Sequence, residues 1–174
     1  MLKIFTTQLF GIFRKIQEHE EERVEDCARL LAQSVIGDGK VYIKGFNELE
    51  SIPHVIMESE ERISSMLPYT NEVELRPEDA LLIFIKTTDD ERLTELLDQA
   101  KSAGTSTITV GAVEKGEEPG TDEFHIDTKL LQGLVPDDEG RRIGYPTFMC
   151  ALYVYYALFF TLSEMLEEYG MNEG

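Results

Sequence analysis

The stretch Asp79–Gly104, DALLIFIKTTDDERLTELLDQAKSAG, decides the fold of this chain. Its first part, Ala80–Ile85, is continuously apolar, which is typical of a parallel strand buried on both faces. A polar loop follows, and then a helix with apolar residues at helical spacing that ends at Gly104. A further strand over Thr107–Val110 completes a βαβ unit. Such a unit predicts a parallel sheet covered by helices.

Segments on both sides of this unit extend the same architecture. Lys40–Phe46 is rich in β-forming residues, so it predicts another strand. Pro53 suits the first turn of a helix that runs to about Met66. Two more short strands are predicted, at Glu72–Leu75 and Phe124–Ile126.

Helices are predicted at both ends of the chain. An apolar stripe from Leu2 to Ile16 predicts one amphipathic helix, and a second is expected from Val24 to Val35, after the acidic stretch Glu18–Glu22. The last helix, about Thr147–Glu168, is apolar nearly all round, which predicts burial on more than one side. We therefore predict one domain over 1–174, with helices over 1–36 and a sheet with flanking helices over 40–168. The fold class is α/β, a three-layer αβα sandwich with a parallel sheet of about five strands and flavodoxin-type topology.

Composition restricts the partners more than the fold. The chain carries 16 Lys and Arg against 34 Asp and Glu, a formal charge of −18, so neither nucleic acid nor an anionic membrane is an expected partner. Cys27 and Cys150 lie in apolar helical patterns, which favours buried free thiols. The N-terminus lacks a sustained apolar region, and the longest apolar run, Phe148–Leu162, is short for a membrane span. We expect a cytoplasmic protein.

Ligands of open parallel sheets bind beyond the carboxyl ends of the strands, and three loops qualify here. They are Gly45–Ser51, Lys86–Asp90 and Gly111–Gly120. A phosphate in such a place needs backbone N–H groups at a helix N-terminus, helped by hydroxyl residues.

The residues of these loops resemble the SIS (sugar isomerase) family, especially its phosphoheptose isomerase branch. In that branch a strand of the type DxLLxxS runs into a Ser-Thr-Ser-Gly-Asn-Ser phosphate loop and a helix ending AxxxG. The family loop falls here on Ile85-Lys86-Thr87-Thr88-Asp89-Asp90, and KVYIKG (Lys40–Gly45) is similar to the family's preceding strand. The resemblance implies the SIS fold, a sugar-phosphate ligand, aldose–ketose isomerisation and assembly as a homo-oligomer.

The loop departs from the family pattern in its charge. Thr87 keeps a hydroxyl in register and Thr88 replaces a glycine, while Asp89, Asp90 and Glu91 occupy the start of the helix. These carboxylates can satisfy the helix amides themselves and repel a phosphate. Two interpretations stay open: phosphate binding, helped by Lys86, or a purely structural cap.

The first loop, Gly45–Ser51, also has two interpretations, ligand binding or an ordinary structural loop. Gly45 is the one glycine that it keeps, and Asn47 and Ser51 can hydrogen-bond a ligand or serve as ordinary loop and cap residues.

His54 and Glu58 stand four apart and share a helix face. The resemblance implies a catalytic base at Glu58, with His54 beside it, although the pair can also be a solvated helix pair. The family's zinc ligands on the last helix are missing, so we expect no metal and no other cofactor. Arg141 and Arg142 can clamp an anion or balance their acidic neighbours. His125, in a short strand, is expected in the core or at an edge.

Two functions follow. One is a phosphoheptose-type isomerase, with Glu58 as base and the polar loop residues holding phosphate and hydroxyls. The other is a non-catalytic SIS-like module that senses a carbohydrate derivative or binds a partner protein. A flavodoxin-like redox or receiver domain would have the same kind of sheet, but this chain lacks the nucleotide or acidic-pocket motifs of such domains at its first strand.

Overall fold

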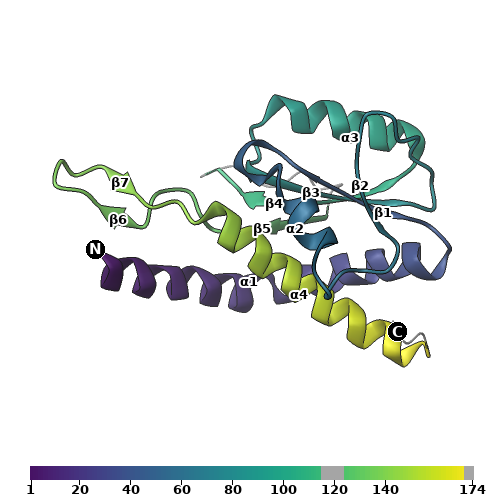
Figure 1. The fold of residues 1–174 in the computed structure, drawn as a ribbon, viewed down its shortest axis with the longest axis horizontal. Helices are drawn as coiled ribbons and strands as arrows, with labels where there is room; N and C mark the ends of the chain where they lie inside the picture. The colour runs from purple at the N-terminus through teal and green to yellow at the C-terminus, as the bar shows by residue number, and fades with distance from the viewer. Residues whose placement is uncertain (115–123, 171–174) are drawn as a thin grey trace.

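The computed structural model describes residues 1–114 and 124–170, and a five-stranded sheet forms the centre of this part (Figure 1). The strands lie in the order β2-β1-β3-β4-β5, and neighbours run parallel. They are β1 (Val41–Gly45), β2 (Met66–Pro68), β3 (Ala80–Thr87), β4 (Ser106–Ala112) and β5 (Phe124–Asp127). The predicted α/β class and the parallel five-stranded sheet of flavodoxin-type order are confirmed.

The central strand β3 is buried as its apolar sequence predicts. Leu82 pairs with Ile43 of β1 on one side and with Ile108 of β4 on the other. Because side chains alternate along a strand, Leu82 and Phe84 enter one hydrophobic cluster, and Leu81 and Ile83 enter another. All of these side chains are fully buried, which explains the unbroken apolar run.

Helices on both faces of the sheet make three layers. Helix α3 (Glu91–Ala103) packs its apolar side against one face, and Figure 1 shows it on the opposite side of the sheet from α1 and α4. Helices α1 (Leu2–Ile36), α2 (Ile52–Met57) and α4 (Thr147–Glu168) build the cluster on the other face. The sheet therefore has a separate hydrophobic core on each face.

The prediction of two N-terminal helices is wrong, because α1 is one continuous helix of 35 residues. Glutamate is a good helix former, so the acidic stretch Glu18–Glu22 does not interrupt the helix. Glu20 is also buried in the fold, where its carboxylate lies 2.5 Å from the Lys129 ammonium. This ion pair holds the acidic stretch against the rest of the fold, and the local sequence pattern cannot reveal it.

Two boundaries between β1 and β3 also differ from the prediction. Helix α2 ends at Met57, well before Met66, because the chain turns at Ser59, whose hydroxyl accepts the Glu61 N–H at 3.1 Å. The second edge strand is Met66–Pro68, paired with β1, whereas Glu72–Leu75 forms no strand. The turn at Ser59 thus ends the helix that the sequence pattern extended to Met66.

Helix α4 covers the predicted range and packs its buried side into the core. The loop before it contains a short hairpin of β6 (Val135–Pro136) and β7 (Arg142–Ile143) that projects beyond the sheet (Figure 1). By length and hydropathy α4 could cross a membrane, but 39% of its most apolar window is buried within the protein. The buried side chains of α4, from Cys150 to Leu166, belong to the hydrophobic core, and the cytoplasmic location stays a prediction.

Candidate functional site

The chain leaves β1 and β3 toward opposite faces of the sheet. After β1, η1 (Asn47–Leu49) and α2 send Leu49 and Ile52 into the cluster shared with α1 and α4. After β3, α3 sends Leu93 and Leu96 into the opposite cluster. The position between β1 and β3 is therefore the topological switch point, where open α/β sheets bind ligands.

The first loop turns sharply at the end of β1. Gly45 is required, since a Cβ there would lie 1.9 Å from the Leu49 carbonyl oxygen. Asn47 has φ of +56°, a left-handed conformation that asparagine tolerates better than most residues. Both residues predicted here have a structural role, and the turn directs the Asn47 side chain across to the second loop.

A hydrogen-bonded group joins the two loops, and we call Asn47, Asp90 and Arg92 the latch. Arg92 Nη2 donates to Asn47 Oδ1 and to Asp90 Oδ2, both at 2.7 Å, and Asn47 Nδ2 donates to Asp90 Oδ2 at 3.3 Å. The guanidinium also lies 5.0 Å from the centroid of the Phe46 ring. The hydrogen bond from Arg92 lowers the pKa of Asp90. The latch therefore fills this part of the switch point with the protein's own charges.

The start of α3 is capped by these same groups. Asp90 is the N-cap, and its Oδ1 accepts the Arg92 backbone N–H at 3.0 Å, with Glu91 in the first turn. Asp89 is not the cap; it accepts a hydrogen bond from the Thr87 hydroxyl. The structural-cap interpretation therefore holds for Asp90.

Lys86 and Thr88 stand at the end of β3 without strong partners. The Lys86 ammonium lies 4.6 Å from the centroid of the Tyr145 ring and 4.0 Å from a Glu48 carboxylate oxygen. The Thr88 backbone N–H donates to the Ala112 carbonyl at 3.2 Å. Its hydroxyl oxygen is buried and has no hydrogen-bond partner within the described part of the chain.

His54, Glu58 and Ser51 stand apart from these groups. His54 and Glu58 are exposed on or next to the six-residue helix α2, where the Glu58 N–H caps the helix by donating to the His54 carbonyl at 3.1 Å. Ser51 is the N-cap of α2 but makes no side-chain cap hydrogen bond. Among the residues that the structure describes, no side-chain hydrogen bond or ion pair holds His54 or Glu58 in a catalytic arrangement.

A second polar group, the buried triad, lies at the end of β5 and consists of Glu20, Asp127 and Lys129. The Lys129 ammonium meets Glu20 at 2.5 Å and Asp127 at 3.0 Å, and Glu20 also accepts the Asp127 N–H at 3.2 Å. Lys129 has φ of +59°, an uncommon conformation for a lysine. Burial alone would lower its pKa, but the hydrogen bonds to both carboxylates raise it overall. The triad ties α1 to the sheet.

The other singled-out residues are structural. His125 is buried, with Nδ1 2.7 Å from the Thr109 hydroxyl and Nε2 3.1 Å from the Gly111 carbonyl, which confirms a core position. Burial lowers its pKa. Cys27 and Cys150 are buried free thiols as predicted, and burial raises the pKa of each to about 12.

The contacts of Arg141 and Arg142 distinguish between the two predicted roles of the pair, an anion clamp and a balance for acidic neighbours. Arg141 Nε pairs with Asp137 at 2.8 Å and its Nη2 with Glu139 at 3.0 Å, so it balances acidic neighbours. Arg142 donates to the carbonyls of Gly133 and Leu134 at 2.9 and 3.2 Å, which holds the hairpin together. An anion clamp by this pair has no support in these contacts.

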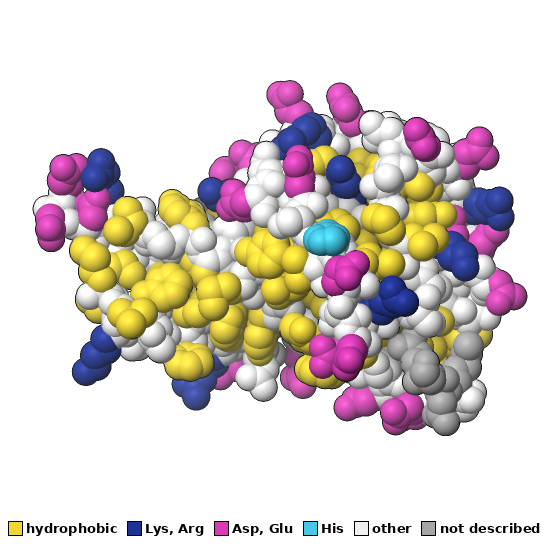
Figure 2. Space-filling model, in the orientation of Figure 1, with side chains coloured by type: hydrophobic (Ala, Val, Ile, Leu, Met, Phe, Trp, Pro, Cys, Tyr) yellow, Lys and Arg dark blue, Asp and Glu magenta, His cyan; other side chains and the backbone are white. Residues whose placement is uncertain are grey.

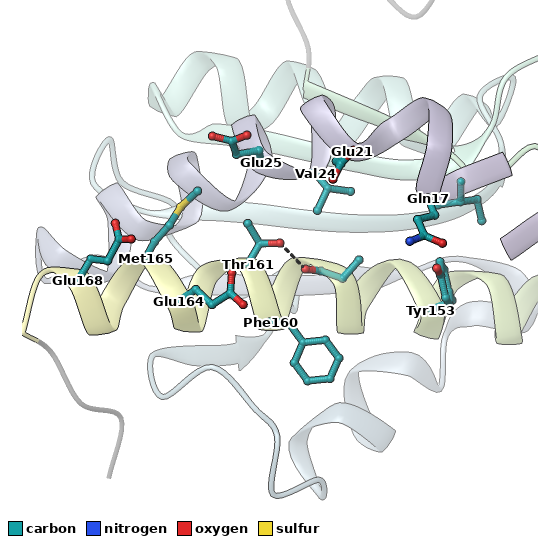
Figure 3. Close-up of a pocket in the computed structure, with 12 residues that line it drawn as sticks. Gln17, Glu21, Val24, Glu25, Tyr153, Phe160, Thr161, Glu164, Met165 and Glu168 are labelled. Carbon is teal, nitrogen blue, oxygen red and sulfur yellow. Dashed lines mark hydrogen bonds between the residues drawn. The ribbon is translucent and has the colours of Figure 1, made fainter. Parts of the chain in front are cut away.

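A groove of about 500 Å³ lies between α1 and α4, away from the switch point (Figure 3). Its apolar lining includes Val24, Phe160 and Met165, and four glutamates belong to it: Glu21, Glu25, Glu164 and Glu168. The four carboxylates repel an anionic ligand. This groove therefore suits an apolar partner better than a sugar phosphate.

Metal ligands are not grouped in this structure. Within residues 1–114 and 124–170 there is no group of three or more His, Cys, Asp or Glu side chains that could hold a metal ion. The third predicted loop lies partly outside the described residues, from 115 to 120.

Sequence reasoning missed Arg92 and Tyr145. The position of Arg92, two residues after Asp90, is a detectable signal, because an N-cap carboxylate often meets a nearby cation. Tyr145 contacts Lys86 across 59 residues of sequence, and no local pattern indicates such a contact.

Solved structures similar to this one include phosphoheptose isomerases and a sugar isomerase domain. A phosphoheptose isomerase from Francisella tularensis superposes with a TM-score of 0.68 at 14% identity, covering 92% of this chain and 94% of that chain. The sugar isomerase domain of an RpiR transcription factor from Sphaerobacter thermophilus gives a TM-score of 0.60 at 13% identity, covering 96% and 91%. At these identities the similarity establishes the fold, which is the sugar isomerase (SIS) type.

Residues 1–166 match a family described as Domain of unknown function (DUF2529), and the chain belongs to this family. A relative in Bacillus subtilis (strain 168), Uncharacterized protein YwjG, is 43% identical over 174 residues. The match covers 98% of this chain and the whole of that protein.

Proposed function

We propose that this protein binds a phosphorylated sugar, or a related carbohydrate derivative, at the switch point between β1 and β3, without isomerising it. One observation carries the proposal: the predicted ligand residues Asn47, Lys86, Thr87 and Thr88 lie at or just after the carboxyl ends of β1 and β3, beside the latch. The SIS fold supports the choice of ligand, because the neighbours of this fold are named for sugar isomerisation.

The exposed pair on α2 favours binding over turnover. Isomerisation needs a carboxylate within hydrogen-bond reach of two adjacent substrate carbons. Glu58 is exposed at the end of a six-residue helix, and no described side chain fixes its position. The sugar isomerase domain of a transcription factor shares the fold with the isomerases, so the fold itself does not require catalysis.

A thermal-shift panel tests the proposal. The panel contains aldose and ketose phosphates of five to seven carbons and amino-sugar phosphates, each at low salt because the chain carries a charge of −18. A ligand at one hundred times its Kd should stabilise the fold by about 2.7 kcal/mol, or roughly 5–10 °C in Tm. A panel without any shift would contradict the proposal.

An isomerase is the competing function, and the hits of the panel distinguish it. Each hit is incubated with the protein and assayed for aldose–ketose interconversion. We expect no conversion above a blank. Turnover that Glu58→Gln abolishes would replace our proposal with the enzymatic one.

The protein also assembles as a homodimer in our proposal, through α1 and α4. Exposed apolar side chains gather where α1 begins and the hairpin projects (Figure 2), and they include Leu2, Phe10 and Met149. Phe160, 57% exposed, continues this surface along α4. Light scattering should give twice the 19.8 kDa chain mass, and Phe160→Glu should shift the mass toward that of one chain. Leu67→Glu, on the exposed edge strand, is the matched control. An unchanged dimer in Phe160→Glu would exclude this surface.

A further inference from the structure

We infer that the phosphate of the ligand binds at the N-terminus of α4, beside Lys86, and not at the N-terminus of α3. The inference rests on the proposed function and specifies where the charged end of the ligand lies. Helices α3 and α4 both begin near the same edge of the sheet. They differ in whether side chains already accept hydrogen bonds from the backbone N–H groups of the first turn.

The N-terminus of α3 is already occupied. Asp90 accepts the Arg92 backbone N–H, Glu91 adds a second carboxylate to the first turn, and Asp89 stands directly before them. Arg92 itself is held by Asp90 and Asn47. A phosphate dianion approaching these amides meets three carboxylates first, so this end is closed to it electrostatically.

The N-terminus of α4 lacks these groups. Its N-cap is Pro146, which makes no side-chain cap hydrogen bond, and the first turn contains no acidic residue. The first backbone N–H groups of a helix have no acceptor within the helix, and α4 is 22 residues long, so its dipole is fully developed. Met149, in the first turn, is 47% exposed, so solvent reaches this end.

A buried hydroxyl at this end lacks a partner. Thr147 is 7% exposed, and its Oγ1 has no hydrogen-bond partner among the described residues. It shares the buried face of α4 with Cys150, Ala151 and Val154, which is the face turned to the sheet. Buried side-chain hydroxyls without a partner are few in the described residues, namely those of Ser65, Thr88 and Thr147, and Thr147 is the one that lies at a helix N-terminus.

Lys86 supplies the charge. Its ammonium contacts the ring of Tyr145, two residues before Thr147, so the end of β3 and the start of α4 lie together. Its carboxylate neighbour is Glu48 at 4.0 Å, a distance at the limit of an ion pair, and both side chains are about half exposed. Such a weak pair is easily exchanged for a phosphate.

The chemistry of this group fits a phosphate monoester. Helix amides, a hydroxyl donor and an ammonium are the donors that phosphate oxygens accept from in proteins. The buried Thr88 hydroxyl, at the end of the same strand as Lys86, is a further donor without a partner in the described chain. With the phosphate here, the sugar would extend toward Asn47.

Isothermal titration tests the inference, with inorganic phosphate and with the sugar phosphate that gives the largest thermal shift. We expect Lys86→Met and Thr147→Val each to weaken both probes by about tenfold. Thr147→Ser should bind nearly as well as the parent chain, and Glu48→Gln should bind more tightly. Lys101→Met, on exposed α3 surface, is the matched control.

A second measurement does not depend on any substitution. In amide NMR spectra of the unmodified protein, phosphate should shift the Thr147, Phe148 and Met149 N–H signals more than those of Glu91 and Arg92. This ordering tests the location directly, even where a variant fails to fold.

The outcomes separate the two proposals. Sugar-phosphate binding that Lys86→Met and Thr147→Val leave unchanged, with shifts centred on Glu91 and Arg92, overturns the inference and leaves the proposed function standing. Binding of inorganic phosphate at α4 without binding of any sugar phosphate supports the site and overturns the proposed function. Binding of neither probe overturns both.

Discussion

The latch joins two loops at the carboxyl edge of the sheet, whereas the buried triad joins α1 to the end of β5, and the two groups lie in different surroundings. In the latch, Arg92 is 47% exposed and Asp90 16% exposed, whereas in the triad Lys129 is 28% exposed and Glu20 5% exposed. Exposed ion pairs contribute little to stability and exchange partners easily, while a buried charge depends on its partner. The triad therefore fixes the frame of the sheet, and the latch is the part that can rearrange around a ligand.

The largest expected effect comes from breaking the triad. Lys129→Met should lower the free energy of unfolding by about 3 kcal/mol, because Glu20 is then buried without a cation. Denaturant unfolding measures this loss. The double variant Glu20→Gln, Lys129→Met should recover part of it, and Lys101→Met should stay within about 0.5 kcal/mol of the parent. A loss below 1 kcal/mol in the single variant would mean that the triad resembles the latch.

Acid should weaken the core beside the triad through His125. Burial lowers the pKa of this histidine, while Asp127 and Glu20 oppose the shift; Thr109 and Gly111 contact the ring, and Arg23 reinforces the shift. The unfolded chain therefore binds the proton first, near the ordinary value of 6.5, and stability falls as the pH drops below it. Unfolding at about pH 7.5 and 5.5 should show a steeper loss for the parent than for His125→Asn. Parallel losses would contradict the assignment.

The smallest effects belong to the latch. Asp90→Ala removes the α3 cap and should destabilise by about 1 kcal/mol. Arg92→Met should cost less than about 0.5 kcal/mol, because the pair is exposed. Arg92 lowers the pKa of Asp90, so this stabilisation is present above the unfolded value of 3.8 and disappears as the pH falls through the lower folded value. Chemical denaturation of both variants checks the ranking, and an Arg92→Met loss above 2 kcal/mol would make the latch structural.

The sequence was sufficient to predict the parallel sheet and its central strands, but it placed the second edge strand at Glu72–Leu75, whereas the structure has it at Met66–Pro68. The continuous apolar run Ala80–Ile85 predicted a strand buried on both faces, and Gly104 ends α3 in the left-handed conformation that favours glycine. Distant contacts were not predictable: Glu20 in the middle of α1 is buried against Lys129, more than one hundred residues away.

The positions of the candidate site residues were predictable in part. Asn47, Lys86, Thr87 and Thr88 lie at or just after the carboxyl ends of β1 and β3, because the carboxyl ends of parallel strands share one edge. His54 and Glu58 are spaced for one helix face, but α2 ends too soon to bury them. Arg92 and Tyr145 were missed because their contacts cross between loops.

The single long helix α1 also sets the order in which the fold can be completed. It is synthesised well before its buried partners at β5 and α4, and Glu20 and Asp127 are 107 positions apart in the sequence. The apolar stripe of α1 therefore stays uncovered during most of synthesis. The entropy of closing that long loop is lost before the burial of α1 can compensate for it, which slows folding and leaves the young chain exposed to aggregation.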